Sequence, residues 1–418
     1  MRFKKNKLAM RNLHIAPWVP LPPNIGGLET YLSWLCMGQV KEGDKVFIIG
    51  RTKAPLSHSS WYTVKGITYY IIPARNFPKH FPLNLRNPST FLNLLTNTLS
   101  NIPLTLRIVT YIRPDVIFFY EVYQAPVSLL CRLLGYPTIL GHFAFQPHWN
   151  PLIPHDKEVS LIYFIWYSIL RCFSAVYTHV KSLLNSNGKI QNLYLLHHIL
   201  GKRRAYFIPG CIDPSSFTNI KPDPEIEKIK EKGFFIVLCP RRLVPEKGVY
   251  YLLKAIPKIL VNVTKDVMFL FTGEGPLLPF LKTEAVRLGV RNNVIFTGNI
   301  PYESVLRYMS SSDLVVVPSS GEETLGIVIL EAYALKKPVV GTRFGGIPQV
   351  VEENRSGLLV QPANAEELAD AIIKLLGSPC MREQLGKRGY ELVQGRFNIL
   401  KTVTKLRQVY SCLMTLEN

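Results

Sequence analysis

Two carboxylates eight positions apart, Glu323 and Glu331, form the strongest chemical signal in the sequence. They follow an apolar run over residues 314–317, which ends at Pro318 and predicts a strand, a polar turn and a helix. Open α/β sheets bind ligands at the carboxyl ends of their strands, and free N–H groups at a helix N-terminus favour anions. Both carboxylates are therefore candidates for ligand binding or for general acid–base chemistry.

A second loop could also take part in binding or catalysis. Residues 240–248 present Arg242 and Lys247 between a predicted strand and a predicted helix. Arginine offers a planar fork to phosphate and lysine a point charge, so the pair predicts a diphosphate clamp. Solvated surface cations are the alternative interpretation. The GxGxxG and GxxxxGK[ST] patterns are absent from the sequence, which disfavours dinucleotide enzymes and P-loop nucleotidases.

The first half of the chain adds three weaker candidates. Gly26 and Gly27 precede a helical pattern over 28–40, where glycine permits close approach of the backbone to a ligand or forms a plain turn. His142 ends a predicted strand over 138–142, and a ligand-binding and a structural role are both open for it. The sequence contains no D-x-D pair and no zinc-type spacing, so we predict no metal site.

The elements that must position these residues alternate between strands and helices, twice in succession. A chain of 418 residues exceeds one ordinary core. The pattern predicts an α/β protein with two Rossmann-like, doubly wound domains facing across a cleft. We place an N-terminal domain at 1–205 and a C-terminal domain at 206–390. We expect a final helix in 391–418 to pack back towards the N-terminal domain.

Charge is unevenly distributed along the chain. The net charge is +20, and residues 1–205 hold 23 Lys and Arg against 7 Asp and Glu. This excess of positive charge over residues 1–205 indicates an anionic partner, which could be nucleic acid, an acidic membrane surface or a phosphorylated substrate. The basic, aromatic segment 79–99 has a composition that can lie on an anionic membrane or form an ordinary surface helix.

Several features indicate a cytoplasmic protein, with peripheral attachment to the cytoplasmic membrane face as a further hypothesis. The start of the sequence lacks the apolar core of a signal peptide. The most apolar run, residues 159–170, is shorter than the roughly 20 residues that span a bilayer, so we expect a buried helix there. The seven cysteines are scattered, as is typical of reduced thiols in the cytosol.

Six segments, in this order, resemble the retaining glycosyltransferases of family four (glycosyl transferases group 1), which have the GT-B fold. They are residues 22–32, 241–248, 269–276, 294–301, 322–342 and 344–351. The resemblance implies transfer of a hexosyl unit from a UDP- or GDP-sugar, with retention, to a glycan or a polyprenyl- or lipid-linked acceptor. It implies synthesis of a cell-surface glycan, glycolipid or glycoprotein glycan, without a cofactor and without a catalytic metal.

For the donor, the resemblance assigns binding roles to glycines and to one carboxylate. Gly26 and Gly27 would lie near the donor diphosphate. Glu331 would hydrogen-bond the donor ribose, and Gly326 in the same loop would contact the nucleotide sugar.

For catalysis, the resemblance assigns roles to four side chains. Arg242 and Lys247 would neutralise the diphosphate and the charge that grows on it as the glycosidic bond breaks. Glu323 would face the donor sugar, and His142 would approach the same sugar from the N-terminal domain.

The chain departs from the family pattern at two places, and other functions remain open. Arg241 replaces a usual glycine before the clamp arginine, and the domain crossover reads IPGCID over residues 208–213. Alternative hypotheses are a phosphorylase or sugar-nucleotide epimerase on the same fold, and a noncatalytic basic binding subunit. Recognisable RNA-binding signatures are missing, so we expect no nucleic-acid partner.

Overall fold

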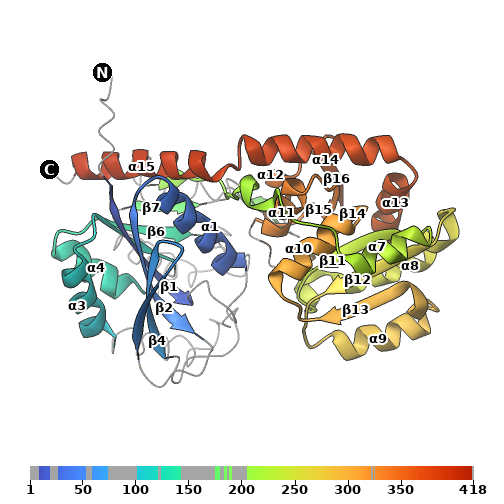
Figure 1. Cartoon of the computed structure of the whole chain (residues 1–418), viewed down its shortest axis with the longest axis horizontal. Helices are drawn as coiled ribbons and strands as arrows, with labels where there is room; N and C mark the ends of the chain where they lie inside the picture. The colour runs from blue at the N-terminus through green and yellow to red at the C-terminus, as the bar shows by residue number, and fades with distance from the viewer. Residues whose placement is uncertain are drawn as a thin grey trace, which may run out of the picture. The chain divides into compact units, whose positions relative to one another are not determined.

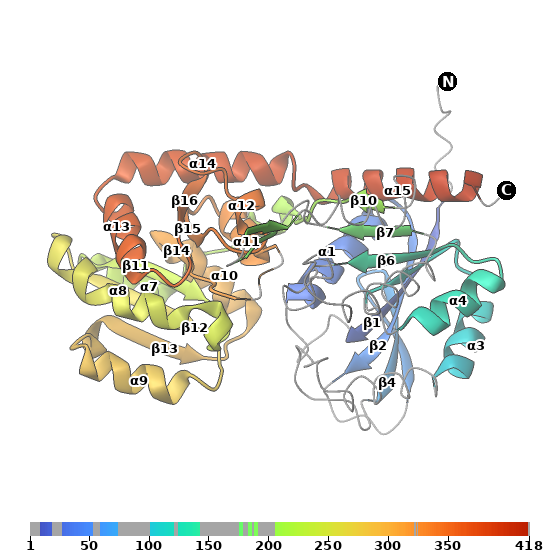
Figure 2. The same cartoon turned by 180° about the vertical axis from the view of Figure 1, so that it is seen from behind.

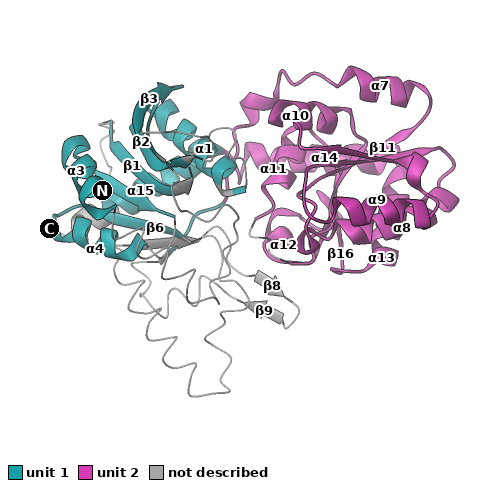
Figure 3. Cartoon of the chain, turned by 90° about the horizontal axis from the view of Figure 1, so that it is seen from below, with its two compact units in different colours: residues 1–179, 192–209, 399–418 teal, residues 180–191, 210–398 magenta. Residues whose placement is uncertain are grey.

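The computed structural model describes residues 9–18, 27–52, 59–73, 101–120, 124–142, 175–178, 183–185, 188–190, 205–321, 323 and 325–416. The chain divides into two compact units (Figure 3). The N-terminal unit comprises residues 1–179, 192–209 and 399–418, and the C-terminal unit comprises 180–191 and 210–398. The boundaries predicted at 205 and 390 lie a few residues before these positions. The sequence did not indicate that 180–191 belongs to the second unit.

The N-terminal unit is built on an eight-stranded sheet with the order β10-β7-β6-β5-β1-β2-β4-β3 (Figures 1 and 2). All its strands are parallel to their neighbours except β3, which is antiparallel to β4 at one edge. The strands are β1 (Arg11–Trp18), β2 (Lys45–Thr52), β3 (Ser60–Val64), β4 (Ile67–Pro73), β5 (Val116–Phe119), β6 (Thr138–His142), β7 (Ala175–Thr178) and β10 (Ala205–Phe207). Apolar runs over residues 13–16, 45–49, 67–73, 115–120, 138–142 and 175–178 predict the six inner strands, whereas the sequence does not indicate the two edge strands, β3 and β10.

Four helices of this unit are described: α1 (Gly27–Lys41), α3 (Ile102–Ile112), α4 (Ala125–Leu133) and α15 (Ile399–Leu416). Helix α15 packs against α1 so closely that a Cβ at Gly38 would overlap the Ile399 side chain. Arg407 of α15 also donates a hydrogen bond of 2.5 Å to the buried carboxylate of Asp44. The helix expected within 159–170 and the basic segment 79–99 lie outside the described residues.

A buried polar network joins α15 to the centre of the N-terminal sheet. His14 of β1 stacks on Phe118 with ring centroids 4.5 Å apart. Its Nε2 bonds to Gln39 Oε1 at 2.8 Å, and its Nδ1 to the Tyr120 hydroxyl at 2.7 Å. Gln39 in turn donates to the hydroxyl of Tyr410 on α15 at 3.5 Å. Burial lowers the pKa of His14 to about 3, so the imidazole is neutral at physiological pH.

The C-terminal unit contains a six-stranded, all-parallel sheet with the order β13-β12-β11-β14-β15-β16. The strands are β11 (Phe235–Pro240), β12 (Val267–Thr272), β13 (Val294–Gly298), β14 (Leu314–Val317), β15 (Val339–Thr342) and β16 (Gly357–Val360). The chain builds the sheet outward from β11 to β13, and then returns to add β14 on the other side of β11. This reversal makes the junction of β11 and β14 a topological switch point.

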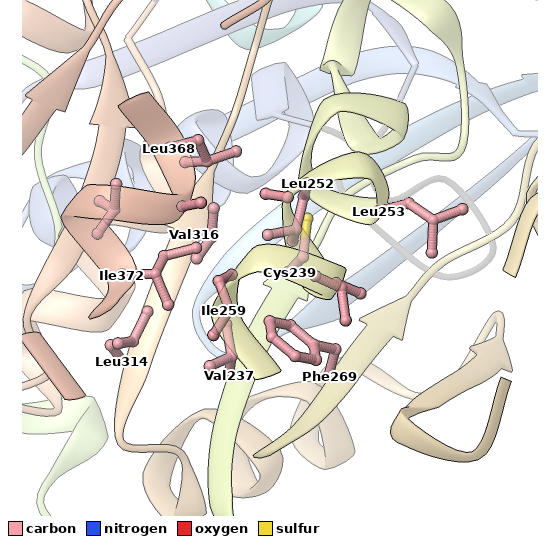
Figure 4. Close-up of a cluster of buried hydrophobic side chains, with 14 of the residues drawn as sticks. Val237, Cys239, Leu252, Leu253, Ile259, Phe269, Leu314, Val316, Leu368 and Ile372 are labelled. Atoms are coloured by element: carbon pink, nitrogen blue, oxygen red, sulfur yellow. The ribbon is translucent and has the colours of Figure 1, made fainter. Parts of the chain in front are cut away.

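Helices cover both faces of this sheet, as the apolar runs of its strands require. On one face α8, α9 and α13 enclose a core that contains Val237, Leu314 and Phe269 (Figure 4). The helices of the unit are α7 (Pro224–Glu231), α8 (Val249–Asn262), α9 (Leu278–Arg287), α10 (Tyr302–Ser311), α11 (Ile327–Ala334), α12 (Ile347–Val350), α13 (Ala365–Leu376) and α14 (Pro379–Gln394). A separate two-stranded sheet pairs β8 (Leu183–Asn185) with β9 (Gly188–Ile190).

Both units are thus parallel-sheet α/β structures, which confirms the predicted fold class. None of the helices described here combines the length and apolarity needed to cross a membrane.

We predict that His14→Phe keeps the stacked ring but destabilises the protein at pH 7.5 by about 1–3 kcal/mol, because two buried hydrogen bonds are lost. The folded-state pKa of His14 lies below its unfolded value, so the stability it supports falls as pH drops below about 6.5. The difference between wild type and variant should therefore shrink towards pH 5, measured by urea unfolding at both pH values. A difference that stays constant would contradict a buried, neutral His14.

Candidate functional site

The candidate site lies in the C-terminal unit, where three loops follow the carboxyl ends of adjacent strands. Residues 241–248 follow β11, residues 318–326 follow β14, and residues 343–346 follow β15. These strands are neighbours in the sheet, and the first two flank its switch point. The fold therefore brings together the two loops that the sequence singled out, although some 75 positions separate them along the chain.

Backbone contacts fix the first two loops against each other. The N–H groups of Ser320 and Gly321 both donate to the carbonyl oxygen of Glu246, at 3.0 and 2.9 Å. Gly248 has a φ of +65°, and a Cβ at this position would overlap the carbonyl oxygen of Pro318. Only glycine combines this backbone conformation with so close an approach, so Gly248 sets the distance between the loops.

Glu323 lies where the loops meet, and its carboxylate is almost fully removed from water, with 7% of the side chain exposed. Its Oε2 accepts hydrogen bonds from Arg241, from Lys247 Nζ at 3.3 Å and from Ser319 Oγ at 3.0 Å. Its Oε1 accepts from the backbone N–H of Gly326 at 3.0 Å. A buried carboxylate needs such pairing, and here two cations supply it.

The third loop holds the backbone of Glu323. Gly346 donates its N–H to the carbonyl oxygen of Glu323 at 3.2 Å. Gly345 has a φ of +56°, and a Cβ there would overlap the same oxygen. The carboxylate is therefore fixed from both its side chain and its main chain, before any ligand binds.

The two adjacent arginines after β11 point in different directions, which the sequence did not predict. Arg242, the expected clamp residue, is exposed, whereas Arg241 is 8% exposed and is the arginine that binds Glu323. Arg241 Nη2 also donates to Ser319 Oγ at 2.8 Å. Burial lowers the pKa of Arg241 to about 10, so it remains a cation at neutral pH. Lys247 approaches Glu323 but Arg242 does not take part in this cluster.

Glu331 lies on α11 and is 3% exposed. Its Oε1 accepts a hydrogen bond of 2.8 Å from the hydroxyl of Tyr302, at the start of α10. Burial raises the pKa of Glu331 to about 7, against the opposing effects of Tyr302 and of the positive charge of Arg241. No pattern in the sequence indicates Tyr302 as a partner of Glu331, because it lies 29 positions away on another helix.

The turn between the two carboxylates is not helical. Helix α11 begins at Ile327, and Gly326 before it has a φ of +72°. Glu323 therefore precedes the helix that carries Glu331. Gly326 provides both the left-handed turn and the N–H that binds Glu323.

The candidates in the N-terminal unit are only partly described. Gly27 opens α1 and is exposed. His142 is the last residue of β6, but its side chain lies outside the described part of the chain, as does Gly26. Their predicted roles stay predictions. In the described part of the chain, no group of three or more His, Cys, Asp or Glu side chains could hold a metal ion.

Comparison with known proteins gives a family match in the C-terminal unit. Residues 221–392 match the family Glycosyl transferases group 1. An alpha-D-kanosaminyltransferase of Streptomyces kanamyceticus is 33% identical over 175 residues, which cover 42% of this chain and 45% of that protein. A GDP-mannose-dependent monoacylated alpha-(1-6)-phosphatidylinositol monomannoside mannosyltransferase of Corynebacterium glutamicum is 30% identical over 201 residues, 46% of this chain and 52% of that protein. The matches span about half the length of these relatives.

A solved structure extends the likeness to nearly the whole chain. Sucrose-phosphate synthase from Thermosynechococcus elongatus superposes with a TM-score of 0.75 over 97% of this chain and 100% of that one. The sequences are 19% identical, so this likeness shows the fold alone. It confirms the predicted GT-B fold.

We predict that Glu331→Gln stabilises the protein at pH 8 by about 1 kcal/mol or more, because a neutral amide costs less to bury than an ionised carboxylate. The folded-state pKa of Glu331 is raised above its unfolded value, so wild type loses stability as pH rises through about 7. The advantage of the variant should therefore shrink towards pH 5, as measured by denaturant unfolding. An advantage that is equal at both pH values would contradict the raised pKa.

Proposed function

We propose that the protein is a retaining glycosyltransferase, because residues 221–392 match the family Glycosyl transferases group 1 and the chain has a GT-B fold. It would move a hexosyl unit from a UDP- or GDP-sugar to a glycan or lipid-linked acceptor. The observation that carries the proposal is the fixed cluster of Glu323, Arg241 and Lys247 at the switch point of the sheet. A buried carboxylate flanked by cations suits a ligand that combines sugar hydroxyls with a diphosphate.

On the donor side, we assign each end of the nucleotide sugar to a different part of the site. Lys247 and the exposed Arg242 would bind the diphosphate, and Glu331 would accept hydrogen bonds from the ribose. Glu323 Oε1, which accepts the N–H of Gly326, would also accept a hydrogen bond from a hydroxyl of the donor sugar. Gly326 would allow the ligand to approach the backbone at the start of α11.

In the reaction, the bond between the anomeric carbon of the sugar and the diphosphate breaks, and negative charge grows on the leaving phosphate. Lys247 and Arg242 would stabilise this charge more strongly than that of the intact donor, which is the condition for acceleration. In this proposal the two side chains neutralise the charge of the leaving phosphate, as a divalent cation does in metal-dependent enzymes. His142, together with Gly26 and Gly27, would complete the site from the N-terminal unit.

For the acceptor, we propose a molecule that is anionic or held at a membrane. The N-terminal half carries most of the net positive charge, with 23 Lys and Arg in residues 1–205. It also exposes large apolar side chains, among them Tyr111 and Leu133. The corynebacterial relative is named for a phosphatidylinositol mannoside, which is such an acceptor. We therefore propose that the protein acts at the cytoplasmic face of a membrane, as a peripheral enzyme of glycan or glycolipid synthesis.

A donor screen tests the proposed activity. We expect a UDP- or GDP-sugar to raise the melting temperature of the protein, since a ligand of the folded state stabilises it. With that donor, Glu323→Ala and Lys247→Ala should each lower nucleotide release by about 10²-fold or more, because a preorganised polar contact is lost. Lys258→Ala is the matched control, since Lys258 pairs with Glu366 and Asp370 on the surface of the same unit.

Near-normal turnover in both site variants would refute the assigned site. Sugar release that depends on inorganic phosphate would instead indicate a phosphorylase, and interconversion of the donor sugar without an acceptor would indicate an epimerase.

Vesicle binding tests the membrane part of the proposal separately. We expect co-sedimentation with vesicles containing anionic lipid at low salt, and release as the salt concentration rises, because exposed charges are screened beyond about 10 Å at 0.1 M ionic strength. Neutral vesicles are the control. Equal binding to anionic and neutral vesicles would remove the membrane proposal but leave the glycosyltransferase proposal intact.

A further inference from the structure

Glu323 has two cationic partners on the same oxygen, and they are not equivalent. Arg241 donates through Nη2 to Glu323 Oε2 and also to Ser319, with 6% of its side chain exposed. Lys247 reaches the same Oε2 through one contact of 3.3 Å, with 14% of its side chain exposed. The arginine is the more deeply buried of the two.

The surroundings of Arg241 fix it in place. A Cβ on Gly273, at the end of β12, would come within 2.5 Å of the Arg241 carbonyl oxygen. The next-but-one residue, Leu243, donates its N–H to Glu274 at 2.9 Å. Ser319, which binds the guanidinium, is itself held, because Thr342 Oγ1 donates to its carbonyl oxygen at 2.6 Å. The backbone of Arg241 and its guanidinium group are therefore both held in place.

Lys247 is differently placed. It ends a short 3₁₀ turn, Pro245–Lys247, and carries its charge on a flexible four-carbon stem. A diphosphate bound at this loop would compete with Glu323 for the lysine ammonium group. If Lys247 were the only cation on Glu323, its departure would leave a buried carboxylate without a counter-ion, which strongly disfavours the transfer.

We propose that Arg241 is a positioning residue that serves as the permanent counter-ion of Glu323, and so allows Lys247 to transfer from Glu323 to the donor diphosphate. This inference rests on the proposed function, because it needs a diphosphate ligand. In this proposal Arg241 acts through Glu323 and does not bind the sugar or the phosphate itself. It stands at the position where the family pattern has glycine, so the chain supplies an additional charge at this point.

The test measures binding of UDP and of GDP to the full chain by titration calorimetry, without any turnover. Arg241→Gln keeps a hydrogen-bond donor for Ser319 but removes the charge, so Lys247 should stay on Glu323. We expect the nucleotide that binds wild type to bind this variant about tenfold or more weakly. Adding Glu323→Gln removes the carboxylate that retains Lys247. The double variant should therefore bind the nucleotide within about threefold of the Glu323→Gln single variant.

The neighbouring arginine provides a matched control. Arg242→Gln should also weaken nucleotide binding, but Glu323→Gln should not restore it, because Arg242 does not contact Glu323. If Arg241→Gln proves unfolded by circular dichroism, Arg241→Lys takes its place, with a smaller loss expected because the charge is kept.

The outcomes separate the inference from the function on which it rests. Unchanged nucleotide binding in a folded Arg241→Gln, or a loss that Glu323→Gln fails to restore, would overturn the inference alone. A folded wild-type protein that binds neither UDP nor GDP would overturn the proposed donor chemistry, and the inference with it.

Discussion

A carboxylate taken out of water must be paired, and the loops of the C-terminal unit are arranged around this requirement at Glu323. Its oxygens receive donors from the loop after β11, from the loop after β14 and from the backbone N–H of Gly326. Arg241 and Lys247 lie 82 and 76 positions away from Glu323 along the chain, so the fold brings these two cations to it. The glycines at 248 and 345 are needed because any side chain there would push the loops apart.

The sheet topology explains why this cluster forms here. At the switch point, the helices that follow β11 and β14 leave on different sides of the sheet, so the two loops that precede them meet at its carboxyl edge. Glu331 is buried on α11, and in the described structure its carboxylate accepts a hydrogen bond from the Tyr302 hydroxyl. One carboxylate is thus paired with cations while the other is held close to neutrality. Glu323 in the loop and Glu331 on α11 therefore differ in how their negative charge is compensated.

The sequence predicted the central strands well because each is a short apolar run buried on both faces. It missed β3, β10 and β16, which lie at the edges of their sheets, where pairing on one side suffices for a short strand. It located the site loops but not the direction of their side chains. Arg241 and Arg242 are chemically identical neighbours, and only the path of the backbone after β11 decides which one is buried.

The position of α15 has a consequence for the order in which the two units fold during synthesis. In the N-terminal unit, Ile399 of α15 packs against α1, and Tyr410 of α15 is hydrogen-bonded to Gln39. Both residues of α15 are translated after the whole C-terminal unit. A nascent chain that has emerged only as far as residue 398 can complete the second unit but not the first. The unit that is made first should therefore finish folding last, and until then it exposes the apolar surface that α15 later covers.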